Sequence, residues 1–280
     1  MIKRIGVMLI ALFVIVLTAC GNEESATTGA GGAGAAEESS EIIKIATDAA
    51  YAPMEFMDKG EITGFDIDFL KEVMAEAGID YELSNTGWDA MLTSVQQGTE
   101  FAAGISSVSI TEERKATYDY SLPYFESTNM ILFKEGAGIT SAMDLKDMKV
   151  AVQGATTADT LMTEIMGQGN SSLKKFESNV LAFMELESGG VDAAVADVAI
   201  VQEYMKNNPD KAFESILDPE NFDSEYYGIL YPKGSELKAK LDPAIKAVID
   251  NGKYAEVYKK WFGDEPDLTR LMEELDKAAE

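Results

Sequence analysis

The sequence has no histidine and only one cysteine among its 280 residues. The lack of histidine excludes Ser–His–Asp and Cys–His catalysis, histidine-ligated zinc and histidine general bases. A single cysteine excludes a disulfide within the chain and a cysteine metal cluster. Most hydrolase and zinc-enzyme mechanisms are therefore excluded.

Basic residues are scarce: 23 Lys and Arg stand against 49 Asp and Glu, which gives a net charge of −26 and a pI of about 4.3. A chain this acidic repels phosphate backbones, so nucleic acid is not an expected partner. Hydrophobic residues make up 46% and aromatic residues 9%, a composition typical of a globular protein with a real core. The length allows one large domain or two medium-sized lobes.

Long apolar runs are also rare, and the longest one lies at the amino terminus. Lys3 and Arg4 precede an apolar stretch over residues 5–17, which is shorter than the roughly 20 residues that comfortably span a bilayer. The stretch ends in Leu-Thr-Ala-Cys-Gly, which resembles a bacterial lipobox. This resemblance implies that residues 1–19 are a lipoprotein signal peptide and that Cys20 carries a lipid. A plain signal peptide or a membrane anchor with an incidental cysteine is the alternative.

Residues 20–40 contain Gly, Ala, Ser, Thr and Glu but no large apolar side chain. Such a segment cannot form a core and is typical of a flexible tether. Since no other segment reaches 18 apolar residues, the remainder is expected to lie outside the cytoplasm, held at the outer face of the cell membrane by the lipid on Cys20.

From residue 41 onward, patterns typical of strands and helices alternate. Helices are predicted over residues 65–77, 88–97, 157–166, 179–187, 198–207, 235–250 and 254–262, and strands over 41–47, 101–105, 129–134, 149–153, 173–176, 193–195 and 227–231. Thr111 is predicted to cap a short helix with acidic residues in its first turn. Residues 264–280 form an amphipathic tail with Leu268, Leu271, Met272 and Leu275 on one side. The alternation predicts an α/β fold with ligand sites at the carboxyl ends of strands.

Several segments carry a resemblance to one family, and they occur in the family's order: residues 45–56, 64–69, 109–114, 150–157, 191–197, 227–229 and 254–263. They resemble the bacterial extracellular solute-binding proteins, family 3, which serve amino-acid ABC transporters. The resemblance implies a type 2 periplasmic-binding-protein fold, in which two lobes are joined by two hinge strands. Lobe one would comprise residues 41–127 plus 226–263, and lobe two residues 132–222, with hinges near 127–132 and 224–229.

The resemblance implies residues that hold the charged ends of an amino acid. Arg114 would bind the carboxylate, because its planar guanidinium can reach both oxygens, and Asp197 would bind the ammonium group. Thr156 and Thr157 begin a helix whose amino end favours an anion. Ser107 and Ser109 would complete the hydrogen bonds. Each buried ion needs such a partner, because an unpaired one costs several kcal/mol.

The ligand's side chain is expected to contact Asp48, Tyr51 and Trp88. Two aromatic rings can enclose an extended or guanidinium side chain, and Asp48 can accept hydrogen bonds from an amide or a cation. A polar or basic amino acid is therefore expected, with Gln, Arg, Lys, His and cystine all open. Alternatively, Tyr51 and Trp88 belong to the core. Glu55 is expected to support its own loop.

Simpler roles exist for the charged anchors. An arginine after Thr-Glu-Glu is commonly a solvated helix residue, whereas Asp197 and Thr156 could each cap a helix. Ala155 stands where the family usually has glycine, so the backbone before Thr156 could approach a carboxylate differently.

The expected function is capture of a free amino acid by lobe closure and its delivery to the ABC permease subunits of the membrane. The protein is expected to be a monomer and not an enzyme, with no catalytic residue, metal or cofactor. Two alternatives use the same fold. One is an enzyme resembling a cyclohexadienyl (prephenate or arogenate) dehydratase, and the other is a ligand-sensing module for a signalling receptor.

Overall fold

The structure, a computed structural model, describes residues 42–278. The predicted signal peptide, the tether and Cys20 lie outside the described residues.

The first sheet is built around β1 (Ile43–Thr47), whose last three residues are buried. This strand runs parallel to β5 (Tyr81–Asn85) on one side and to β6 (Ala103–Gly104) on the other. β14 (Leu230–Pro232) pairs antiparallel with β6 and with β7 (Tyr118–Tyr120), which gives the order β5-β1-β6-β14-β7. We call this sheet and its helices lobe one.

The helices that accompany lobe one are α1 (Phe65–Ala77), α2 (Trp88–Gln97), α3 (Glu112–Lys115), α7 (Leu237–Asp250), α8 (Lys253–Phe262) and α9 (Thr269–Ala278). The predictions for α1 and α2 are confirmed to the residue. Both helices end at a glycine in the left-handed conformation, Gly78 and Gly98. Thr111 caps α3, as predicted, by accepting a hydrogen bond from the Arg114 amide.

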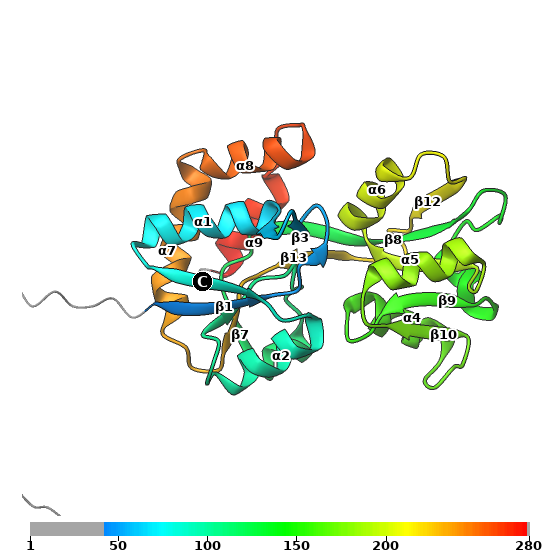
Figure 1. Ribbon diagram of the computed structural model, residues 1–280, viewed down its shortest axis with the longest axis horizontal. Coiled ribbons are helices and arrows are strands. Elements are labelled where there is room, and N and C mark those ends of the chain that lie inside the picture. The colour runs from blue at the N-terminus through cyan, green and yellow to red at the C-terminus, as the bar shows by residue number, and fades with distance from the viewer. Residues whose placement is uncertain (1–41, 279–280) are drawn as a thin grey trace, which may run out of the picture. The chain divides into compact units, whose positions relative to one another are not determined.

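The second sheet, here called lobe two, has β9 (Val150–Gln153) parallel to β10 (Leu173–Phe176) and to β11 (Ala193–Asp197). β8 (Phe125–Lys134) pairs antiparallel with β11 and with β12 (Phe213–Leu217). The helices of this lobe are α4 (Thr157–Met166), α5 (Asn179–Ser188), α6 (Val198–Asn207) and the 3₁₀ helix η1 (Ala142–Asp147). Figure 1 shows β8 extending from lobe one into this sheet.

Two strands link the lobes. The first half of β8 pairs with β13 (Ser224–Tyr227), and its second half belongs to the lobe-two sheet. The predicted continuous strand over 227–231 is wrong, because the chain changes sheets there: β13 ends at Tyr227 and β14 begins at Leu230. The lobe boundaries proposed from the sequence remain predictions.

A small antiparallel sheet, absent from the sequence prediction, follows β1. It consists of β2 (Ala50–Tyr51), β3 (Glu55–Asp58) and β4 (Glu61–Thr63). Its strands have two to four residues each, too short for the sequence pattern to reveal. Tyr51 belongs to β2, whereas the loop before it is held from outside this sheet: the Asp48 amide donates to the Ser106 hydroxyl and the Ala49 amide to Asn85 Oδ1.

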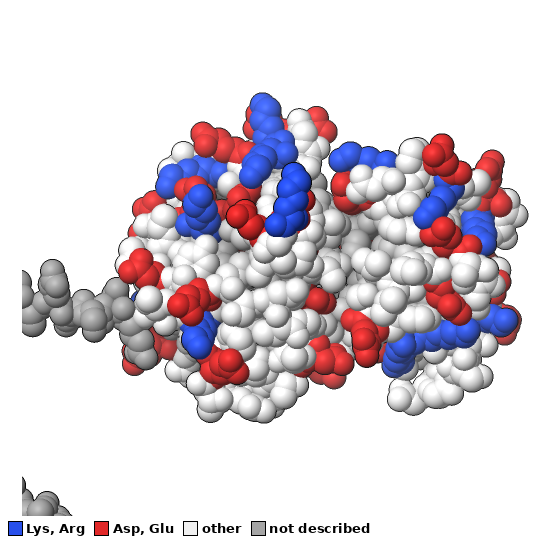
Figure 2. Space-filling view, in the orientation of Figure 1, with Lys and Arg blue, Asp and Glu red and all other residues white. Residues whose placement is uncertain are grey.

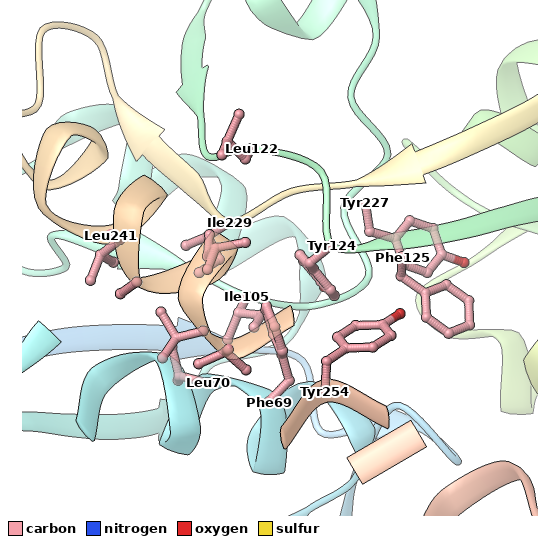
Figure 3. Packing of buried hydrophobic residues seen from close by; sticks show 14 of the residues in the cluster. Phe69, Leu70, Ile105, Leu122, Tyr124, Phe125, Tyr227, Ile229, Leu241 and Tyr254 are labelled. Atoms are coloured by element: carbon pink, nitrogen blue, oxygen red, sulfur yellow. The ribbon is translucent and has the colours of Figure 1, made fainter. Parts of the chain in front are cut away.

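The core of lobe one is rich in aromatic side chains and reaches the linking strands (Figure 3). Phe69 of α1 stacks on Tyr124 with 4.7 Å between ring centroids. Phe125, the first residue of β8, stacks on Tyr227, the last residue of β13, at 5.4 Å. The lobe-one ends of both linking strands are therefore anchored in the core.

The amphipathic pattern of the tail is confirmed. Leu271 and Leu275 of α9 are buried in the lobe-one core, with Leu268 and Met272 partly buried beside them. Arg270 pairs with Glu126 of β8 at 2.9 Å and donates a hydrogen bond to the Ser224 hydroxyl of β13. The tail thus lies against both linking strands.

The described helices include none with the length and hydropathy needed to cross a membrane. On the face drawn in Figure 2, acidic and basic side chains are interspersed over both lobes.

Gly64 is the position where the fold most clearly requires glycine. Its φ is +141°, and a Cβ there would lie 2.0 Å from the carbonyl oxygen of Met54. We expect Gly64→Ala to lower the free energy of unfolding by about 2–4 kcal/mol. Gly60→Ala is the matched control, since Gly60 also has a positive φ (+93°) but a Cβ there meets nothing within 4 Å. Equal losses for the two variants in urea unfolding would contradict this explanation.

Candidate functional site

The nine residues predicted to bind ligand line one cavity between the lobes. They are Asp48, Tyr51, Trp88, Ser107, Ser109, Arg114, Thr156, Thr157 and Asp197. The same cavity is lined by residues that the prediction did not include: Glu55, Ser106, Gln153, Ala158, Asn179 and Ala196. The cavity has a volume of about 30 Å³, room for a few water molecules, so its walls lie close together.

Arg114 reaches across the cavity from α3. Its Nη1 donates to the carbonyl oxygen of Ser109, and its Nη2 donates to that of Ala155 in lobe two, both at 3.0 Å. The guanidinium also lies over the ring of Trp88, with 5.5 Å to the ring centroid. With these contacts, Arg114 is not the ordinary solvated helix arginine that the sequence left as an alternative. Since a guanidinium has five N–H groups, Arg114 keeps donors beyond these two bonds for a ligand.

Lobe two meets Arg114 at the beginning of α4. Ala155 has φ +58°, a left-handed conformation that costs an alanine about 1 kcal/mol relative to glycine. Thr156 is the helix cap: its hydroxyl accepts from the Asp159 amide and donates to the Gln153 carbonyl oxygen. With this hydroxyl occupied, Thr156 would contribute to a ligand through its backbone, beside the unpaired amides of the first helical turn.

Asp197 lies at the end of β11, where it is 8% exposed. It occupies the cap position of α6, but its side chain makes no capping hydrogen bond, so that alternative does not apply. Instead its Oδ2 accepts a 2.5 Å hydrogen bond from the hydroxyl of Tyr227. Burial raises the pKa of Asp197, while hydrogen bonds from Tyr227 and Tyr51 and the charge of Arg114 oppose the rise. A cation placed here would stabilise the ionised carboxylate.

Asp48 follows β1 and contacts lobe two through Gln153. The Gln153 Nε2 donates to Asp48 Oδ2 at 3.3 Å, and Gln153 Oε1 accepts from Asn179 Nδ2 at 2.8 Å. Burial raises the pKa of Asp48, the Gln153 hydrogen bond lowers it, and the charge of Asp89 raises it. Gln153 is the polar last residue of an otherwise apolar strand, and ligand sites are expected at such carboxyl ends. The sequence therefore contained a signal for this cavity residue.

The two predicted aromatic residues serve the core and the cavity together. Trp88 is 8% exposed and packs in a hydrophobic cluster of lobe one. Its indole N–H has no hydrogen-bond partner among the described residues. Tyr51 is partly buried and packs against core clusters of both lobes.

Glu55 supports the loop of Ser106 and Ser107, 51 residues further along the chain, so the expectation that it supports its own loop is wrong. Its two oxygens accept hydrogen bonds from the hydroxyls of Ser106 and Ser107 at 2.7 and 3.3 Å. Asp66 of α1 accepts from the Ser107 amide at 2.7 Å and from the Tyr124 hydroxyl at 2.8 Å. Ser107 is thereby held at φ +50°, facing the cavity.

Glu225 of β13 is the residue near the cavity that sequence reasoning missed most clearly. Its side chain accepts hydrogen bonds from the hydroxyls of Ser109 and Thr157 and from the side-chain amide of Asn129. Burial raises its pKa to about 7, and the charge of Asp197 adds to the rise. Because the Ser109 and Thr157 hydroxyls are engaged in this way, their contribution to a ligand would come from backbone amides.

The model of the family described as "Bacterial extracellular solute-binding proteins, family 3" matches residues 43–264 of the chain. A probable histidine-binding protein of Neisseria gonorrhoeae is 36% identical over 260 residues, covering 91% of this chain and 94% of the relative. The glutamine-binding ABC transporter protein GlnH of Bacillus subtilis is 32% identical and covers 94% of this chain and 98% of its own. Among solved structures, the arginine-, lysine- and histidine-binding protein ArtJ of Geobacillus stearothermophilus has 53% identity and a TM-score of 0.81, covering 83% of this chain and all of its own.

The buried carboxyl pair Glu55 and Asp66 should make stability depend on pH. Burial raises the pKa of Asp66 from 3.8 to about 6, and that of Glu55 well above its usual 4.5. Between the unfolded and folded pKa values the folded chain holds protons that the unfolded chain has released. The free energy of unfolding should therefore fall as pH rises through this range, by about 1–3 kcal/mol.

Glu55→Gln removes the group with the more strongly raised pKa, so the decline should become smaller. Denaturant unfolding between pH 4 and 8 measures it. Asp68→Asn, in the same turn of α1 but bonded to Lys260 and Trp261, is the control and should retain the wild-type slope. Stability that rises with pH over this range would contradict the assignment.

Proposed function

Because the chain belongs to the bacterial extracellular solute-binding proteins, family 3, we propose that it is the substrate-binding component of an ABC importer and binds a polar or basic L-amino acid. The observation that carries this proposal is the set of charged residues that line the cavity. Arg114 from lobe one and Asp197 from lobe two line the same space, and each could pair with one charged end of a zwitterion. The relatives named for histidine and glutamine binding, and the solved structure named for arginine, lysine and histidine binding, support the same class of ligand.

A ligand with a cationic side chain suits the acidic residues of the cavity better than a ligand with an apolar side chain. Of the described residues that line the cavity, Arg114 alone is positively charged, whereas Asp48, Glu55 and Asp197 are acidic. Burial raises the pKa of all three carboxyl groups, which means that each lacks full compensation for its charge. With Arg114 and Asp197 assigned to the backbone groups of the ligand, Asp48 is available to the side chain. Arginine, lysine and histidine are therefore the preferred candidates within the proposed class.

Binding would act through the linking strands. A ligand held by groups of both lobes favours the closed arrangement over an open one and shifts the population toward it. The membrane permease would then recognise the closed form, and no bond of the ligand is made or broken.

A thermal-shift screen of the protein from residue 21 onward against the common L-amino acids tests the class of ligand. A ligand at 100 times its dissociation constant should add about 2.7 kcal/mol to the stability. The basic amino acids are expected to give the largest shifts, followed by glutamine. Shifts confined to aliphatic amino acids, or no shift at all, would contradict the proposal.

Arg114→Ala and Asp197→Ala should each weaken binding of the amino acid found in that screen by about 2–5 kcal/mol, because each leaves a buried ligand charge unpaired. Lys115→Ala is the control, since Lys115 is the neighbouring cation but its one ion pair within residues 42–278 is with the exposed Glu112. Calorimetric titration measures the dissociation constants. Affinity within threefold of wild type for either cavity variant would remove that residue from its proposed role.

We propose further that a lipid on Cys20 anchors the protein to the outer face of the cell membrane, as the lipobox resemblance implies. Cys20→Ser should leave the protein unprocessed or release it into the medium. Fractionation of expressing cells, followed by mass spectrometry of the amino-terminal peptide, measures this. An unmodified Cys20 on membrane-bound wild-type protein would contradict lipid anchoring.

A further inference from the structure

Glu225 lies where the two lobes are joined. It is part of β13 and pairs in register with Ser127 of β8, so it sits on the strands about which the lobes would move. It lines a groove of about 630 Å³ that Arg114 and Thr157 also line. Glu225 is not among the residues proposed to bind the ligand.

The hydrogen bonds of Glu225 connect both lobes through a single oxygen. Oε2 accepts from the hydroxyl of Ser109 in lobe one at 2.5 Å and from the hydroxyl of Thr157 in lobe two at 2.8 Å. Oε1 accepts from Asn129 Nδ2 of β8 at 2.5 Å. If the lobes separate, at least one of the two hydrogen bonds to Oε2 must break, whether Glu225 moves with lobe one or with lobe two.

We propose that Glu225 is a positioning residue of the cleft, whose carboxyl group clasps one hydroxyl from each lobe and stabilises the closed arrangement independently of the ligand. The part played by this clasp in affinity rests on the proposed amino-acid binding, whereas its effect on the lobes does not. Since Ser109 and Thr157 are both cavity residues, the clasp also sets how their backbones face a ligand.

The groups that face Glu225 give the clasp a pH dependence. Burial and the charge of Asp197 of β11 disfavour its ionised form. The hydrogen bonds from Ser109 and Thr157 and the charge of Arg114 of α3 favour that form, and Tyr51 of β2 also interacts with Glu225. Burial and Asp197 prevail and place the pKa of Glu225 near 7, above the usual 4.5. Opening would return the carboxyl group to water and to a lower pKa. The closed form therefore binds the proton more tightly, and closure should weaken as pH rises through 7.

Spin labels at Glu112→Cys and Lys175→Cys, in a Cys20→Ser background of the full chain in detergent, report the distance between the lobes. Both positions are exposed, and they belong to different lobes. Without added amino acid, wild-type protein should give a shorter distance at pH 6 than at pH 8.5. Glu225→Ala should give the longer distance at both pH values. Glu225→Gln, which keeps an acceptor oxygen without the charge, should stay short at both.

Calorimetric titration with L-arginine gives the second readout. Glu225→Ala should bind it about tenfold more weakly at pH 6, and Glu225→Gln should lose the fall in affinity between pH 6 and 8.5. Glu126→Gln, a carboxyl change on β8 that involves no bond between the lobes, is the control and should behave as wild type. Unchanged distances in Glu225→Ala, or a retained pH response in Glu225→Gln, would overturn the clasp. If wild-type protein binds no L-arginine, the preference for a basic ligand fails, and the distance measurement still decides the clasp.

Discussion

The cleft depends on one constraint: charged groups that leave water when two lobes meet must find partners in the other lobe. Arg114 donates to the Ala155 carbonyl oxygen, Asp48 accepts from Gln153, and Glu225 accepts from Ser109 and Thr157. Each of these contacts joins elements far apart in sequence. The carboxyl groups remain incompletely compensated, as their raised pKa values indicate, and this residual demand for positive charge is the basis of the proposed preference for a cationic ligand.

The structure also shows why several residues have two roles. Trp88 packs in a hydrophobic cluster of lobe one, and the Arg114 guanidinium lies over its ring. The hydroxyl of Thr156 is engaged in capping α4, whereas the hydroxyl of Thr157, one residue later, donates to Glu225. Tyr227 belongs to the aromatic core and holds Asp197 through its hydroxyl. Core packing therefore positions the polar groups, so the stability of lobe one and the geometry of the cleft are linked.

Local chemistry made much of the fold predictable. The periodic apolar positions of α1 and α2, with a glycine after each, specify helices whose ends need no tertiary information, and Thr111 caps α3 for the same local reason. The small sheet of β2, β3 and β4 escaped prediction, because its strands are too short to show a period and are stabilised by pairing with one another. The interruption between Tyr227 and Leu230 escaped it as well, since a change of sheet leaves no mark on an extended apolar segment.

The sequence by itself determined the exclusion of histidine and cysteine chemistry, the positions of the long helices, the family resemblance, and nine residues that line one cavity. Only the tertiary structure decided which hydrogen-bond partners the side chains of those residues have. The hydroxyls of Ser109 and Thr157 belong to Glu225, and the side chain of Asp197 turns to Tyr227 instead of capping α6. The reason is that a hydrogen bond between residues 116 or 68 positions apart depends on how two sheets approach each other, and no local pattern encodes that approach.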